Sequence, residues 1–111
     1  MDILFGDHHT DSLCNDDTRA VRRLGAVGAK RLRQRLDDLR AAPSLDVMRS
    51  LPGRCHELTG DRKGQLSLDL EHPLRLIFES ANTPVARKND GGLDWAATTA
   101  VRILGVEDTH G

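Results

Sequence analysis

The sequence is poor in aromatic residues: Phe, Trp and Tyr make up 3% of its 111 residues, and Tyr is absent. It therefore offers no row of rings on which nucleic-acid bases could stack, and we expect a mostly aliphatic core. Long apolar runs are also missing, because Ile3-Leu4-Phe5 is followed at once by polar residues. We expect neither a signal peptide nor a membrane span.

Cysteine is scarce as well. Cys14 and Cys55 are far apart in the chain and form no CxxC motif. Two isolated cysteines do not make a disulfide framework, so they favour a reducing compartment, and we expect a cytoplasmic protein. The cluster Asp7-His8-His9-Thr10-Asp11 contains metal-ligand types but matches no known ligand spacing, so we expect no metal and no other cofactor.

An excess of positive charge is missing too, since the formal net charge is −1. This argues mildly against a protein that binds RNA phosphates. The charges are unevenly distributed, however, because residues 19–40 hold eight basic residues against two acids, Asp37 and Asp38. This segment predicts a basic face, with Arg31 and Arg35 as a test pair for RNA contact, although a solvated helix face is the commoner explanation.

Hydrophobic periodicity predicts the secondary structure. Apolar residues at helical spacing indicate a long helix over 18–42, with a possible break at Gly25 or Gly28. Alternating residues indicate a β-hairpin of strands 65–70 and 74–79. We further expect a strand at 3–5, a short helix or loop at 8–14, a short helix at 45–50, a long loop at 80–98 and a strand at 100–107.

This order of elements, helices first and then antiparallel strands, predicts one α+β domain over residues 1–111. The small antiparallel sheet would carry the N-terminal helices on one side. The loop at 80–98 is long for so small a domain and is therefore expected to be functional or mobile. Within it, Trp95 is expected to plug the core, the alternative being an exposed partner contact.

Four segments resemble the HigB (plasmid-maintenance killer) toxins of the RelE/ParE superfamily. They are Leu51-Pro52-Gly53-Arg54-Cys55-His56-Glu57-Leu58-Thr59-Gly60-Asp61-Arg62-Lys63-Gly64-Gln65, Pro73-Leu74-Arg75-Leu76-Ile77-Phe78, Val106-Glu107-Asp108-Thr109-His110 and Arg40-Ala41-Ala42-Pro43-Ser44-Leu45. The resemblance implies a RelE/ParE-type fold. It also implies the toxin of a type II toxin–antitoxin pair, which cleaves mRNA on the ribosome and thereby inhibits translation.

The same resemblance implies the partners and the site. The partners would be the ribosome with its mRNA and a HigA-like helix-turn-helix antitoxin, through which the complex would bind operator DNA. His56, Asp108 and His110 match active-site positions, and Arg62 and Arg75 match basic positions near the RNA phosphate. Neighbouring Lys63 is a further source of positive charge.

These residue types suit metal-independent cleavage through the RNA 2′-hydroxyl. That reaction needs a base, an acid and positive charge on the phosphate. Histidine serves either proton role near neutral pH, an arginine fork matches phosphate oxygens, and Asp108 could hold a histidine in one tautomer. Residue types alone leave open whether His56 or His110 is the base.

A second hypothesis is a non-catalytic member of the same fold, either a ParE-like inhibitor of a protein target or a degenerate toxin that binds only its antitoxin. Thr59 and Thr109 favour it, because relatives often have Lys and Tyr at these positions. The candidate site residues also have structural explanations. In these, His56 is a half-exposed strand residue, Asp108 pairs with Arg102, and His110 belongs to a frayed chain end.

Overall fold

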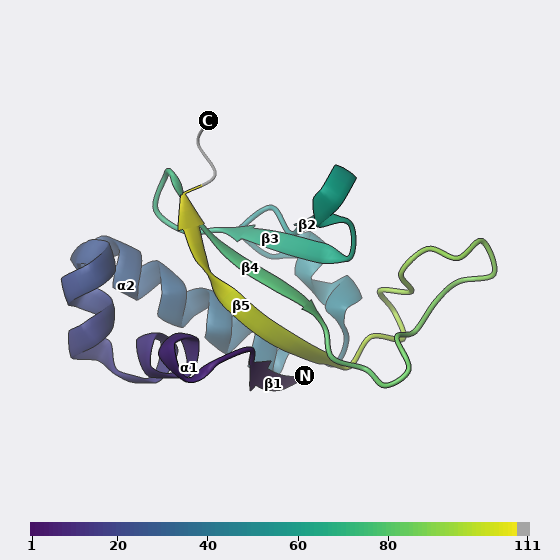
Figure 1. Ribbon diagram of the computed structural model, residues 1–111, viewed down its shortest axis with the longest axis horizontal. Coiled ribbons are helices and arrows are strands. Elements are labelled where there is room, and N and C mark those ends of the chain that lie inside the picture. Colours follow the sequence, from purple (N-terminus) through teal and green to yellow (C-terminus); the bar gives the residue numbers. More distant parts are fainter. Residues whose placement is uncertain (109–111) are drawn as a thin grey trace.

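The computed structural model describes residues 1–108, which form a five-stranded sheet with two helices (Figure 1). Thr109, His110 and Gly111 lie outside the described residues. In chain order the elements are β1 (Asp2–Phe5), α1 (His8–Asn15), α2 (Asp17–Ala41), η1 (Leu45–Ser50), β2 (His56–Glu57), η2 (Gly60–Arg62), β3 (Gln65–Asp69), β4 (Leu74–Ser80) and β5 (Ala100–Asp108), with η denoting a 3₁₀-helix.

The strands lie in the order β1-β5-β4-β3-β2. Neighbours from β2 to β5 are antiparallel, as expected, whereas β1 runs parallel to β5. The chain reaches β5 from β1 through all the other elements, and this long connection permits the parallel pair. The two-residue strand β2 was not predicted, because His56-Glu57 is too short to show any alternation.

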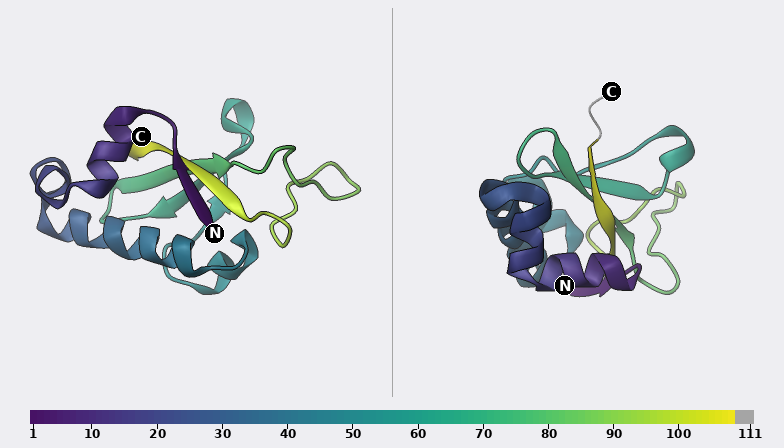
Figure 2. Two further views of the ribbon diagram at one scale, coloured as in Figure 1. Left: turned by 90° about the horizontal axis from the view of Figure 1, so that it is seen from below. Right: turned by 60° about the vertical axis from the view of Figure 1, so that its left-hand side comes forward.

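The core lies between α2 and one face of the sheet, so the helices cover one side only (Figure 2). Leu32, Leu36 and Leu39 of α2 pack against the alternate apolar residues of the strands. The strand side of this core is formed by Leu66, Leu68, Leu70, Leu76, Phe78, Val101, Ile103 and Val106. The α+β architecture predicted from the sequence is therefore confirmed.

The expected break in the long helix lies at Gly25. Its φ of 80° and ψ of 169° are non-helical, a conformation that residues with a side chain rarely adopt. The apolar series of the predicted helix divides near this kink. Gly28 and the leucines after it are buried, whereas Val21 is exposed.

The long β5 strand contains a bulge. Ile77 of β4 pairs with Gly105 and Phe78 pairs with Ile103, which leaves Leu104 as an extra residue on β5. Because strand side chains alternate between faces, one extra residue moves every later side chain to the opposite face. Arg102 and Glu107 consequently share one face, whereas a regular strand would have put Asp108 beside Arg102.

The connection between β4 and β5 extends beyond the end of the sheet (Figure 1) and is fixed at its base by Trp95. Trp95 is 5% exposed, its Nε1 donates to Glu57 Oε2 at 3.0 Å, and the guanidinium of Arg49 lies 3.8 Å from the ring centroid. The prediction that Trp95 plugs the core is confirmed. No helix within residues 1–108 is long and apolar enough to span a bilayer.

Candidate functional site

The sheet face that the helices leave uncovered, here called the open face, is rich in polar side chains. Alternation along the strands places them opposite the core residues. Its members are Arg54, His56, Gln65, Ser67, Asp69, Arg75, Ile77, Glu79, Arg102, Gly105 and Glu107. The predicted residues His56 and Arg75 thus belong to one surface, and Arg62 reaches this surface from η2.

Arg62 extends across the open face. Its Nε donates to Gln65 Oε1 on β3 at 3.0 Å, while Nη1 and Nη2 donate to the two carboxylate oxygens of Glu107 on β5 at 2.8 and 2.6 Å. This fork-to-carboxylate geometry is the one by which arginine also binds phosphate. The hydrogen bond from Arg62 holds the pKa of Glu107 below its usual value and raises that of Arg62.

A row of small or apolar residues lies beneath this guanidinium. Ser67, Ile77 and Gly105 occupy paired positions on β3, β4 and β5, between the level of Gln65 and that of Glu107. Ser67 and Ile77 are fully buried although no helix covers this face. Among the described residues, Ser67 Oγ is a buried polar atom without a hydrogen-bond partner.

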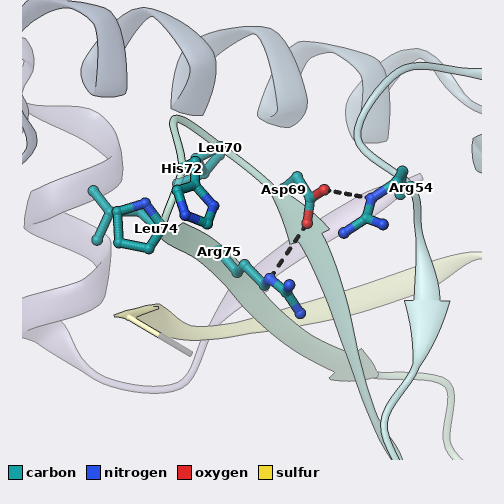
Figure 3. Close-up of a pocket in the computed structure, with 7 residues that line it drawn as sticks. Arg54, Asp69, Leu70, His72, Leu74 and Arg75 are labelled. Carbon is teal, nitrogen blue, oxygen red and sulfur yellow. Dashed lines mark hydrogen bonds and ion pairs between the residues drawn. The ribbon is translucent and has the colours of Figure 1, made fainter. Parts of the chain in front are cut away.

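Asp69 lies between two arginines in a small pocket of about 70 Å³ (Figure 3). Arg54 Nε donates to Asp69 Oδ2 at 2.6 Å, and Arg75 Nε lies 3.4 Å from Oδ1. From the opposite side of the sheet, buried Arg35 donates to the backbone carbonyl of Asp69 at 2.8 Å. Arg35 is therefore a structural link between α2 and β3, and its predicted place on an RNA-binding surface is wrong.

His56 is exposed on β2, directly opposite Ser67. Its Nδ1 lies 2.8 Å from the carbonyl oxygen of Arg54, and a carbonyl can only accept, so Nδ1 carries the proton. In the neutral ring this leaves the lone pair on Nε2, ready to accept a proton. Arg54 has a φ of 50°, a left-handed conformation unusual for a side-chain-bearing residue, and it directs this carbonyl.

Asp108, another predicted site residue, lies on the other face of the sheet. The bulge places Asp108, which pairs with Leu74, on the Val106 side of β5 rather than on the open face with His56. Arg102, which the alternative structural explanation gave to Asp108 as a partner, donates to Glu79 on the open face at 2.9 Å. His110 lies outside the described residues.

Lys63 lines an open groove of about 930 Å³ between the η2 turn and the β4–β5 connection. The groove carries charges of both signs. Its lining residues are Glu57, Lys63, Gly64, Glu79, Ser80, Val85, Arg87, Asp90, Gly91, Gly92 and Leu93. Lys63 therefore lines this groove directly after Arg62 in the chain.

The sequence reasoning missed Arg54, Asp69 and Glu107. The sequence identifies Asp69 only as a polar residue of an alternating strand. Arg54 and Glu107 lie close to the predicted His56 and Asp108, but no sequence pattern marks them as site residues. Their importance depends on partners from distant elements, as in the pairing of Glu107 with Arg62, 45 positions away.

The N-terminal cluster of metal-ligand types has other contacts. Asp7 caps α1 by accepting from the backbone N–H of Thr10 at 2.7 Å, which also lowers the pKa of its carboxyl. His9 Nε2 accepts from Arg23 Nη1 at 2.7 Å. Over residues 1–108, no group of three or more His, Cys, Asp or Glu side chains is arranged to hold a metal ion.

No family model and no curated protein matches this sequence. Among solved structures, the chain is similar to a YoeB/ParE toxin from Agrobacterium tumefaciens, with a TM-score of 0.60. The alignment covers 99% of this chain and 100% of that toxin, at 12% sequence identity. The two proteins share a fold, so the predicted RelE/ParE-type fold is confirmed.

Proposed function

We propose, from the fold shared with a YoeB/ParE toxin and the composition of the open face, that this protein is a HigB-like toxin of a type II toxin–antitoxin pair. It cleaves mRNA on the ribosome in the cytoplasm, and a HigA-like helix-turn-helix antitoxin neutralises it. The observation that carries the proposal is His56, held in one tautomer on the same face as Arg62 and Arg75.

His56 acts as the base. Its Nε2 accepts the proton of the RNA 2′-hydroxyl, and the resulting oxygen nucleophile attacks the adjacent phosphorus. The bond from phosphorus to the 5′-oxygen breaks, and His110 gives that oxygen a proton. The products are a 2′,3′-cyclic phosphate and a free 5′-hydroxyl, which balances the reaction without a co-reactant. Asp108, which precedes His110 closely in the chain, orients that histidine.

Positive charge stabilises the phosphate as negative charge builds on its oxygens. Arg75 is suited to this role, since its guanidinium lies on the open face, where its Nε is 3.4 Å from Asp69 Oδ1. Arg62 and Lys63 supply further positive charge at the η2 end of the face.

The test is induction of the chain alone in a bacterial host, with primer extension on a reporter mRNA. Wild-type protein should arrest growth and produce cuts inside translated codons that disappear when translation is blocked. His56→Gln should slow cutting by about 10²–10⁴-fold, the usual contribution of a general base. His110→Ala should also abolish cutting. Both variants should have the same midpoint of denaturant unfolding as the wild type.

His8→Gln is the matched control, because His8 is an exposed histidine on α1 away from the open face. It should cut like the wild type. Cleavage by His56→Gln at the wild-type rate would show that His56 is not an active-site residue.

The second candidate is a non-catalytic member of this fold, a ParE-like inhibitor or a degenerate toxin. The occupied fork of Arg62, the position of Asp108 and the threonines at 59 and 109 favour it. Growth arrest without mRNA cuts would support a protein target, and no arrest with retained antitoxin binding would support a degenerate toxin.

A further inference from the structure

We propose that Glu107 is an internal competitor of RNA: its carboxylate occupies the phosphate position on Arg62, and an incoming phosphate must displace it. This inference rests on the proposed function, since it assigns a regulatory contact to the same open face. It makes the free protein a closed form, in which the guanidinium covers the row formed by Ser67, Ile77 and Gly105.

The geometry of the ion pair supports this role. Both carboxylate oxygens of Glu107 accept from Arg62, at 2.8 and 2.6 Å, as two phosphate oxygens would. The arginine and glutamate side chains are 35% and 42% exposed, so a dissolved phosphate can approach the pair. Exposed ion pairs contribute little to stability, so exchanging one anion for another leaves the fold intact.

The segment that carries Arg62 can move without disturbing the core. It is a turn between Gly60 and Gly64, which have φ values of 67° and 97°, and a Cβ added at either glycine would meet no atom within 4 Å. None of the residues of η2 is buried. Arg62 can therefore leave Glu107 with its turn while β3, β4 and β5 stay in place.

Ser67 is a second, independent observation. A buried hydroxyl without a partner costs free energy, so it usually marks a place where another polar group belongs. Ser67 Oγ is buried, lies on the open face opposite His56 and has no hydrogen-bond partner within residues 1–108. When the guanidinium lifts, this hydroxyl is presented to the RNA backbone beside the proposed base.

The test measures binding of an all-2′-deoxy heptanucleotide, which has the phosphates of RNA but cannot be cleaved, by fluorescence anisotropy across a salt series. Glu107→Gln removes the competing charge and should tighten binding about tenfold. Its log–log salt slope should stay close to that of the wild type, because Arg62 contacts a phosphate in both bound proteins and only the cost of displacing Glu107 is removed. A change that merely damaged the structure would weaken binding.

Asp46→Asn is the matched control. It also removes one negative charge from an exposed ion pair with an arginine, 2.9 Å from Arg49 on η1, away from the open face. It should tighten binding less than twofold. Ser67→Ala in the Glu107→Gln background should weaken binding several-fold without lowering the midpoint of unfolding. Equal affinities for wild type and Glu107→Gln would overturn the proposal.

A measurement on the wild-type protein makes the test independent of any variant. In NMR titrations with the heptanucleotide, the pKa of the Glu107 carboxyl should rise toward its usual range as Arg62 exchanges partners. If the heptanucleotide binds and the Glu107 signal does not change, the proposal that a phosphate displaces Glu107 from Arg62 is wrong. Tight binding by Glu107→Gln without mRNA cuts in cells would contradict the nuclease and leave the competition in place. If the wild type cuts mRNA in cells but Glu107→Gln does not bind the heptanucleotide more tightly, the nuclease proposal stands and the competition is contradicted.

Discussion

The thiols of Cys14 and Cys55 are half-buried against the core, and both cysteines are free. Burial raises the pKa of Cys14 to about 11 and that of Cys55 to about 12, from an ordinary value of 9.0. Because the thiolate is the reactive species, we expect both to react with a disulfide reagent at pH 8 at least about 100-fold more slowly in the folded than in the unfolded protein.

Single Cys14→Ser and Cys55→Ser variants assign the two rates, and the same reaction in guanidinium chloride is the control. Fast labelling of folded protein at pH 8 would show that the cysteine concerned leaves its buried environment. The sequence predicted isolated, reduced cysteines, and the structure adds the physical reason for low reactivity.

At the scale of single residues, the sequence predicted several residue types of the candidate site but few of the atomic contacts between them. The tautomer of His56 depends on the left-handed backbone of Arg54, and no local pattern predicts a non-glycine residue in that conformation. The fork of Arg62 meets Glu107 only because the fold brings this long side chain from the turn before β3 within hydrogen-bond distance of β5.

The kink of α2 provides a test at the scale of an element. Gly25 has backbone angles that favour glycine alone, and a Cβ added there would meet nothing within 4 Å. Gly25→Ala should therefore act through the backbone and lower the free energy of unfolding by about 1–3 kcal/mol in denaturant titrations.

Val27→Ala is the control for this helix. Val27 is 54% exposed two positions away, so its truncation should change the free energy of unfolding by less than about 0.5 kcal/mol. A Gly25→Ala variant as stable as the wild type would mean that the helix straightens without cost.

Periodicity predicted the elements that bury one regular face and failed where geometry interrupts the pattern. The hairpin β3–β4 alternates without a break, so its limits were predicted closely. Strand β5 alternates only on either side of Leu104, and the bulge there moved Asp108 away from its predicted face. Strand β2 exists through its pairing with β3 alone.

At the scale of the whole molecule, charge distribution matters more than net charge. The net charge of −1 provides no general attraction to RNA, and several basic side chains of α2 are paired: Arg33 with Asp17, Arg40 with Asp37, and Arg35 with the backbone of β3. Exposed Arg22 and Lys30 remain as candidates for contact with ribosomal RNA.

We therefore predict that Arg22→Gln with Lys30→Gln weakens association with ribosomes and flattens its salt dependence. The log–log slope should fall by roughly 0.7 for each phosphate that the variant no longer neutralises. Sedimentation with ribosomes over a salt series measures both the affinity and its salt dependence.

The control with the same charge change is Arg87→Gln with Lys88→Gln, on the β4–β5 connection. If the control pair has the larger effect, the β4–β5 connection and not α2 is the surface that contacts the ribosome. If neither pair changes the slope, neither α2 nor the β4–β5 connection neutralises RNA phosphates, and the open face is left as the proposed contact surface.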